Sequence, residues 1–151
     1  MDKNTILAAI DQAFGHIPRP EIMLREPTHC EECVDHETVM QAVTPQTVSL
    51  HEIGNPGWDP VCYVADETFG YFMPAFARLA LDADNHYAYL HQLFFHLGHT
   101  DRIAAFNTNQ RQAVAQLMDY LSENLLDVMI ANCLETDFDL VNANLAAANS
   151  A

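Results

Sequence analysis

The chain has 151 residues, of which 50% are apolar, and it carries 21 acidic but only 6 basic side chains, a formal net charge of −15 at pH 7. A chain of this length fits one domain and buries roughly 70% of its extended-chain surface, so its core needs no disulfide framework. The scarcity of Lys and Arg argues against direct binding to nucleic acid. No apolar run approaches the roughly 20 residues that span a bilayer.

The N-terminus, from Met1 to Thr5, lacks the basic start, long apolar stretch and cleavage site of a secretory signal. We therefore expect a cytoplasmic protein, a single domain over residues 1–151, with no membrane association. The sequence does not indicate its oligomeric state.

The first expected helix covers residues 5–14, because apolar side chains recur there at helical spacing and Gly15 follows. The prolines of the segment 17–20 fix two φ angles and disfavour helical backbone at the residues before them. We predict a rigid, extended crossing segment there. Thr28 and Glu31 have the spacing of a capping box, which predicts that a second helix opens here and runs to about residues 39–43.

Further helices are expected in the second half of the chain. Asp66 is a good N-cap for a helix over 67–82, and Gly98 is a natural residue to end a helix over 86–97. Asn107 and Gln110 again have capping-box spacing, and an apolar stripe from there to Met129 predicts one long helix near 107–131.

A last short helix is expected to start at Thr136 or Asp137 and to reach Leu145. The alanine- and asparagine-rich end is expected to fray from about residue 146. No internal repeat and no run of alternating strand residues is present. The sequence therefore predicts an all-α fold, a single compact helical domain of about six to seven helices.

The segment 29–36 brings together four metal-ligand side chains, His29, Cys30, Cys33 and His36. The Cys-x-x-Cys spacing is the one with which a helix start presents two thiolates to one ion, and His36 follows one helical turn later. On a helix His29 and His36 stand roughly 10 Å apart along the axis, so one ion takes both only if the first turn unwinds. The segment predicts a zinc-type site of Cys30, Cys33 and His36, with His29 as a further ligand candidate.

Two other interpretations of the cluster stay open. The two thiols could be a redox pair, although the five acidic side chains from Glu26 to Glu37, both included, disfavour a thiolate there unless a metal cation compensates. They could also be small buried core residues. A tetrahedral site would need one more ligand, and the sequence does not choose among the remaining candidates: His16, His51, His86, His91, His96, His99, Cys62 and Cys133.

The sequence offers no convincing catalytic motif. The segment 51–55 begins like a zinc-protease helix, but Asn55 stands where the second histidine belongs. A phosphate-binding Gly-rich loop and a nucleophile elbow are both absent. The sequence therefore favours a protein without enzymatic activity over an enzyme that uses Cys30 or Cys33 as a redox thiol, and we assign no catalytic residue.

The C-terminal part carries charge of one sign, because no Lys or Arg follows Arg111. A field of this kind steers basic partners, and a basic protein is the partner class that it suggests. A solvated acidic face that maintains solubility explains the same pattern. The acidic residues in question are Asp119, Glu123, Asp127, Glu135, Asp137 and Asp139.

Several motifs spread over most of the chain are similar to those of a family of small bacterial proteins catalogued as a domain of unknown function. They are Arg19-Pro20, the cluster His29-Cys30-x-x-Cys33-x-x-His36, the segment 71–76 and Gln110-x-x-Ala113-Val114. The resemblance implies a bacterial source, and it carries no activity to particular residues.

Overall fold

A computed structural model describes all 151 residues, and it is all-α, as the sequence predicts. It contains nine α-helices, two 3₁₀ helices and no strand. In chain order the elements are α1 (Lys3–Phe14), α2 (Glu31–Gln41), α3 (Leu50–Ile53), η1 (Pro60–Cys62), α4 (Asp66–Ala80), η2 (Ala83–Asn85), α5 (Leu90–Gly98), α6 (Arg102–Ala105), α7 (Thr108–Asn124), α8 (Leu126–Ala131) and α9 (Glu135–Ser150). The count exceeds the expected six to seven because α3, α6 and α8 are too short to produce a periodic pattern.

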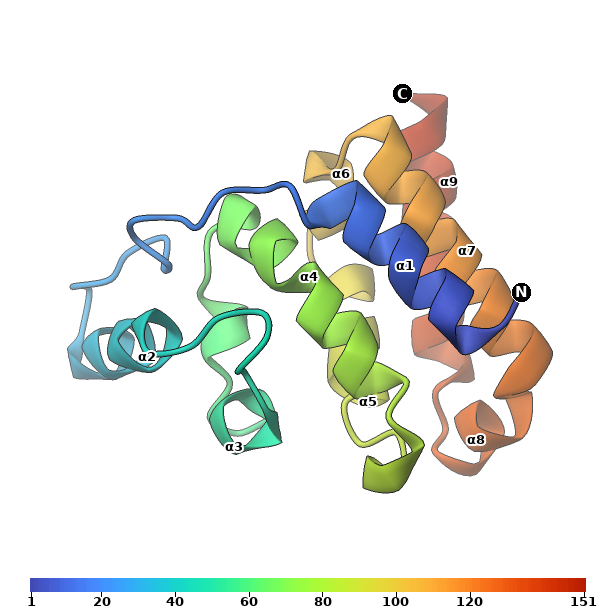
Figure 1. Cartoon of the computed structure of the whole chain (residues 1–151), viewed down its shortest axis with the longest axis horizontal. Coiled ribbons are helices and arrows are strands. Elements are labelled where there is room, and N and C mark those ends of the chain that lie inside the picture. The colour runs from blue at the N-terminus through green and yellow to red at the C-terminus, as the bar shows by residue number, and fades with distance from the viewer.

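The longer helices form the main bundle (Figure 1). α1 packs against α7 and α4, while α5 packs against α9 and α4. The segment 15–30 leaves α1 and runs beyond the upper end of α4 to reach α2, which lies with α3 beside the bundle. η1 joins the two parts, since it contacts both α2 and α3 and directly precedes α4.

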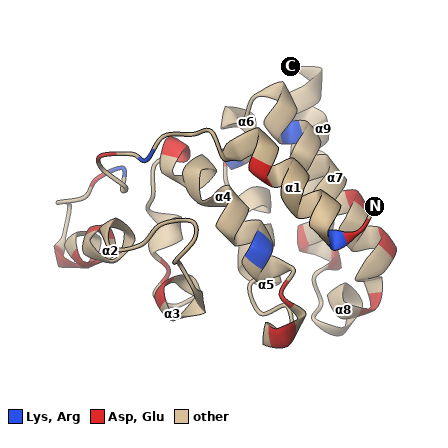
Figure 2. Ribbon diagram, in the orientation of Figure 1, with Lys and Arg blue, Asp and Glu red and all other residues tan.

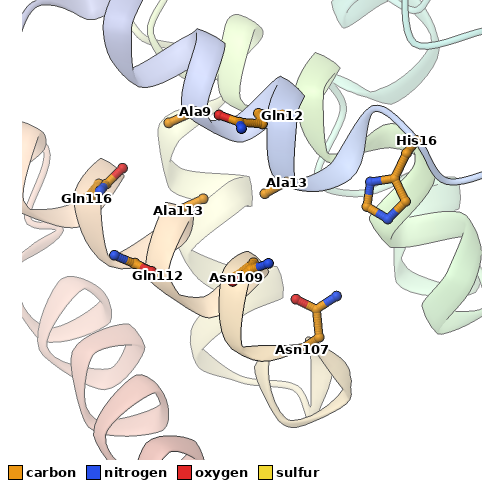
Figure 3. Close-up of a pocket in the computed structure, with 9 residues that line it drawn as sticks. All are labelled: Ala9, Gln12, Ala13, His16, Asn107, Asn109, Gln112, Ala113 and Gln116. Atoms are coloured by element: carbon orange, nitrogen blue, oxygen red, sulfur yellow. The ribbon is translucent and has the colours of Figure 1, made fainter.

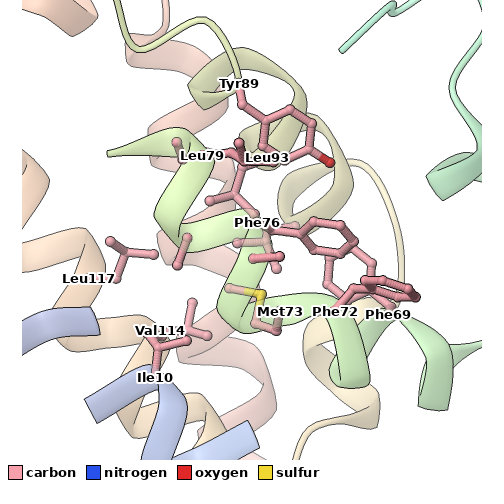
Figure 4. Packing of buried hydrophobic residues seen from close by; sticks show 14 of the residues in the cluster. Ile10, Phe69, Phe72, Met73, Phe76, Leu79, Tyr89, Leu93, Val114 and Leu117 are labelled. Carbon is pink, nitrogen blue, oxygen red and sulfur yellow. The ribbon is translucent and has the colours of Figure 1, made fainter. Parts of the chain in front are cut away.

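The core lies around α4, and the buried residues of this helix lie on most of its circumference (Figure 4). The rings of Phe69 and Phe76 lie 5.1 Å apart, and that of Phe76 lies 5.8 Å from Tyr89 at the start of α5. Gly70 has a specific role, because a Cβ there would lie 2.9 Å from Ile17 Cδ1. The missing side chain lets the crossing segment pass close to α4.

The crossing segment, which in the structure extends over residues 15–30, is held against α2 by side-chain hydrogen bonds. The Glu37 carboxylate accepts the backbone N–H of Met23 at 3.0 Å and that of Leu24 at 2.8 Å. The Arg19 guanidinium donates to the carbonyls of Val43 at 2.8 Å and Gln41 at 2.7 Å. These bonds satisfy backbone groups that have no strand or helix partner, and they position the loop that precedes α2.

Two expected helices differ in extent. The predicted helix over 107–131 begins at the expected Asn107–Gln110 capping box but is divided at Leu125, whose φ of −126° leaves the helical region. This turn keeps Leu125 and Met129 in the core. The helix expected over 86–97 begins only at Leu90, because His86 and Tyr87 adopt positive φ after η2.

The C-terminal end also differs from expectation, since α9 continues to Ser150 rather than fraying from about residue 146. Asn144 donates to the carbonyls of Leu97 and Gly98, and the Arg111 guanidinium donates to the side chain of Asn149 at 3.0 Å. These contacts tie α9 to α5 and α7.

Candidate functional site

The predicted cysteine pair lies at the N-terminus of α2. Cys30, not Thr28, is the N-cap residue, so the expected Thr28–Glu31 capping box does not form. The Cys30 sulfur accepts the backbone N–H of Cys33, and the two Sγ atoms lie 3.4 Å apart. The Cys-x-x-Cys spacing thus brings the two thiols together at a helix start, as the sequence predicts.

Both thiols open into a pocket of about 430 Å³ between α2 and η1, here called the thiol pocket. It is lined by Arg25, Glu26, His29, Cys30, Glu32, Cys33, Cys62 and Tyr63. Three of the four cysteines of the chain therefore face one cavity together with an imidazole and two carboxylates. Cys62, far away in the sequence, arrives there because η1 packs against α2.

His36 occupies a different position from the other three predicted residues. Its ring is fully buried and lies 4.6 Å from the Trp58 ring and 5.1 Å from the Tyr63 ring. Nε2 hydrogen-bonds to Glu32 Oε1 at 3.1 Å, while Nδ1 has no partner. His36 does not line the thiol pocket, and no three of the predicted ligands His29, Cys30, Cys33 and His36 bring ligand atoms within 4.8 Å of one another.

The surroundings raise the pKa of two of these thiols, Cys33 and Cys62, in the metal-free protein. The hydrogen bond shared with the Cys30 thiol raises the pKa of Cys33, and burial adds to the effect. Burial and the Asp59 carboxylate raise the pKa of Cys62 to about 11, although the Arg102 guanidinium acts in the opposite direction. Cys62 as a residue is exposed, but burial of its thiol is the larger cause of the raised pKa. A free thiolate is thus disfavoured at both positions, and for Cys33 the Glu32 carboxylate is a smaller cause than the hydrogen bond and burial.

A second group of polar side chains, which includes Cys62, lies between η1 and α5. We call Asp59, Cys62, Tyr89, Gln92 and His96 the polar centre. The Asp59 carboxylate is buried and accepts from the backbone N–H of Val61 at 2.9 Å, from Gln92 Nε2 at 2.9 Å and from His96 Nε2 at 2.8 Å. Asp59, Cys62 and His96 are the only three His, Cys, Asp or Glu residues whose ligand atoms all lie within 4.8 Å of one another.

Buried polar atoms without a partner gather around this centre. His96 Nδ1 and the Tyr89 hydroxyl have none, nor does Nε of the neighbouring Arg102. Burial raises the pKa of Tyr89 well above its ordinary value, and the nearby Asp59 and Cys62 add to the effect. The Arg102 guanidinium is otherwise bonded to Asp66 at 3.0 Å and to the Val61 carbonyl at 3.2 Å, which fixes η1 to α4 and α6.

Sequence reasoning named Cys62 and His96 only among many alternatives and missed Asp59. Asp59 precedes Pro60 and caps a 3₁₀ turn, so locally it is typical of a turn residue. Its contact with His96 joins residues 37 positions apart. No local spacing signals that contact.

Another cavity offers few reactive side chains. It measures about 480 Å³, lies between α1 and α7, and is lined mainly by amide and small side chains (Figure 3). His16 is the only ionisable residue that lines it. The cavity therefore offers no paired nucleophile and base.

No protein-family model, curated protein or solved structure matches the chain. The family resemblance drawn from the motifs stays a prediction. None of the helices combines the length and the apolarity needed to cross a membrane.

Proposed function

We propose that the protein binds a zinc-type ion in the thiol pocket, through the thiolates of Cys30 and Cys33 and the imidazole of His29. The observation that carries the proposal is the 3.4 Å separation of the two Sγ atoms inside a pocket that His29 also lines. Neither the His29 imidazole nor the Glu32 carboxylate lies within 4.8 Å of both sulfurs, so these two side chains have to turn toward the thiols when the ion binds. Tetrahedral zinc with Zn–S bonds of 2.3 Å holds two sulfurs about 3.8 Å apart. The thiols are thus within about half an ångström of the spacing that zinc requires.

Glu32 is the candidate for the fourth ligand position. Its carboxylate lines the same pocket, and its Oε1 is held by His36 Nε2 and by the Tyr63 hydroxyl. In this arrangement His36 orients a ligand instead of binding the ion, a role that hydrogen-bonded neighbours often have around metals. The acidic surroundings favour a bound cation and offset the charge of the ion.

The proposed role of the ion is structural. The loop before α2 is tied to the helix by Glu37, but His29 and Cys30 have no side-chain hydrogen bond to another element. An ion bound to His29, Cys30 and Cys33 would join the end of this loop to the first turn of α2. We infer a cytoplasmic location, where thiols remain reduced and available to the metal.

Elemental analysis by mass spectrometry tests the proposal on untagged protein that is purified without chelators. We expect the Cys30→Ser, Cys33→Ser variant to contain one equivalent of zinc less than the wild type. The Cys133→Ser variant is the matched control, because Cys133 is exposed and does not line the thiol pocket. Equal zinc content in all three proteins would contradict the proposal.

A second candidate function is the binding of a basic partner by the acidic C-terminal part. Figure 2 shows acidic positions and no basic ones over α8 and the adjoining part of α7. Leu126 and Ile130, four residues apart on α8, are both 51% exposed. Exposed apolar side chains flanked by Glu123 and Asp127 fit the face of a basic, amphipathic helix.

Fluorescence anisotropy with a labelled Lys/Leu amphipathic peptide tests this second function. We expect the Glu123→Gln, Asp127→Asn variant to bind the peptide more weakly, and the difference to shrink at high salt. The control variant Asp11→Asn, Glu21→Gln removes two equally exposed charges elsewhere. The same affinity in both variants would count against a site on α8.

A further inference from the structure

The polar centre combines three kinds of metal ligand on two firmly held elements. Asp59 and Cys62 come from η1 and its N-cap, and His96 comes from α5. Their ligand atoms all lie within 4.8 Å of one another. Because Arg102 bonds to the Val61 carbonyl, η1 is fixed against the bundle before any ion arrives.

An independent observation shows that the hydrogen bonding of this centre is incomplete. His96 and Tyr89 are 1% and 0% exposed, yet His96 Nδ1 and the Tyr89 hydroxyl have no hydrogen-bond partner. Nearly all buried polar atoms in proteins are paired, so unpaired ones mark a place where a further group belongs. Here the Tyr89 hydroxyl lies near both Asp59 and Cys62, and His96 Nδ1 belongs to the ring whose Nε2 contacts Asp59.

We propose that Asp59, Cys62 and His96 hold a zinc-type divalent ion of their own, separate from the ion of the thiol pocket. A carboxylate oxygen, a thiolate and an imidazole are ligands that zinc accepts. Binding releases the Cys62 thiol proton to solvent, and the ring proton of His96 moves from Nε2 to Nδ1, which frees Nε2 to bind the ion. The proposal goes beyond the proposed function, because none of its ligands binds the ion of the thiol pocket.

The geometry needs shifts of up to about 1 Å, because ligand atoms as much as 4.8 Å apart have to come within about 3.8 Å of one another. Tetrahedral zinc with bonds of 2.0–2.3 Å sets ligand atoms about 3.3–3.8 Å apart. The Asp59–His96 pair, now at 2.8 Å, has to open by about half an ångström. Gln92 Nε2 and the Val61 N–H continue to hold the carboxylate. With three protein ligands the site leaves a fourth position for water or another ligand.

Cobalt(II) titration of the full-length Cys30→Ser, Cys33→Ser variant tests this site in a protein whose thiol pocket lacks its two thiol ligands. We expect one equivalent of Co²⁺ to bind, with the ligand-field bands of a tetrahedral site and one thiolate-to-metal charge-transfer band. Adding Cys62→Ala or His96→Gln should abolish these bands, whereas adding Cys133→Ser should leave them unchanged. Zn²⁺ at a hundredfold excess over its dissociation constant should raise the melting temperature by roughly 5 to 10 °C.

Absence of bound Co²⁺ in the Cys30→Ser, Cys33→Ser protein would overturn the second site and leave the thiol pocket untouched. Bands that survive both Cys62→Ala and His96→Gln would overturn it as well. Circular dichroism verifies that each variant is folded. Should the buried His96→Gln variant unfold, the exposed Cys62→Ala variant decides the outcome alone.

Discussion

Replacement of Asp59 by alanine should be among the most damaging single changes in this protein. The carboxylate is 4% exposed and accepts hydrogen bonds from the Val61 N–H, Gln92 Nε2 and His96 Nε2. Each bond to a buried charge contributes about 1.5–3 kcal/mol. Gln92 keeps its second bond, to the Ile53 carbonyl at 2.8 Å, and water can enter the space that is left. We therefore expect a loss of about 3–5 kcal/mol, the range measured when one partner of a buried pair is removed.

Urea denaturation followed by circular dichroism measures this loss, with a chelator present so that no metal contributes. The melting temperature should fall by roughly 6 to 20 °C for a chain of this size. The control Asp139→Ala removes an exposed carboxylate on α9 that makes no side-chain hydrogen bond, and it should change the stability by less than about 0.5 kcal/mol. A loss below about 1 kcal/mol for Asp59→Ala would refute the reasoning.

Two further predictions concern the thiols and the crossing segment. In the metal-free protein Cys62 should react slowly with iodoacetamide at pH 7, and its rate should rise about tenfold per pH unit until it levels off near pH 11, because its pKa is about 11. Exposed Cys133 is the internal reference, and fast labelling of Cys62 at pH 7 would contradict the result. Glu37→Ala should cost about 1–3 kcal/mol, since the N–H groups of Met23 and Leu24 lose their acceptor. Limited trypsin digestion should then cut the segment 15–30 faster, and an unchanged digestion rate would oppose this.

The fold could be predicted from the sequence where a helix carries its own signals. The capping box of Asn107 and Gln110 starts α7 as predicted, since both partners of that contact lie within one turn. The division at Leu125 could not be predicted, because an apolar stripe continues through it and only tertiary packing turns the chain there. Short helices such as α3 lack the length for a periodic pattern.

The candidate sites show the same difference between local and distant contacts. The Cys30–Cys33 contact follows from spacing along one helix start, and the structure contains it. His36 has the right spacing for a ligand, but in the structure its ring packs against the rings of Trp58 and Tyr63. Spacing alone gives no sign of that tertiary contact.

X-ray absorption at the zinc edge tests the central claim, metal binding in the thiol pocket, most directly. The measurement uses the Cys62→Ala variant loaded with one equivalent of zinc, so that the polar centre contributes no thiolate. Two sulfur atoms at about 2.3 Å and two nitrogen or oxygen atoms at about 2.0 Å are expected from Cys30, Cys33, His29 and Glu32. A coordination shell without sulfur, or zinc that is lost on dialysis, would contradict metal binding by Cys30 and Cys33.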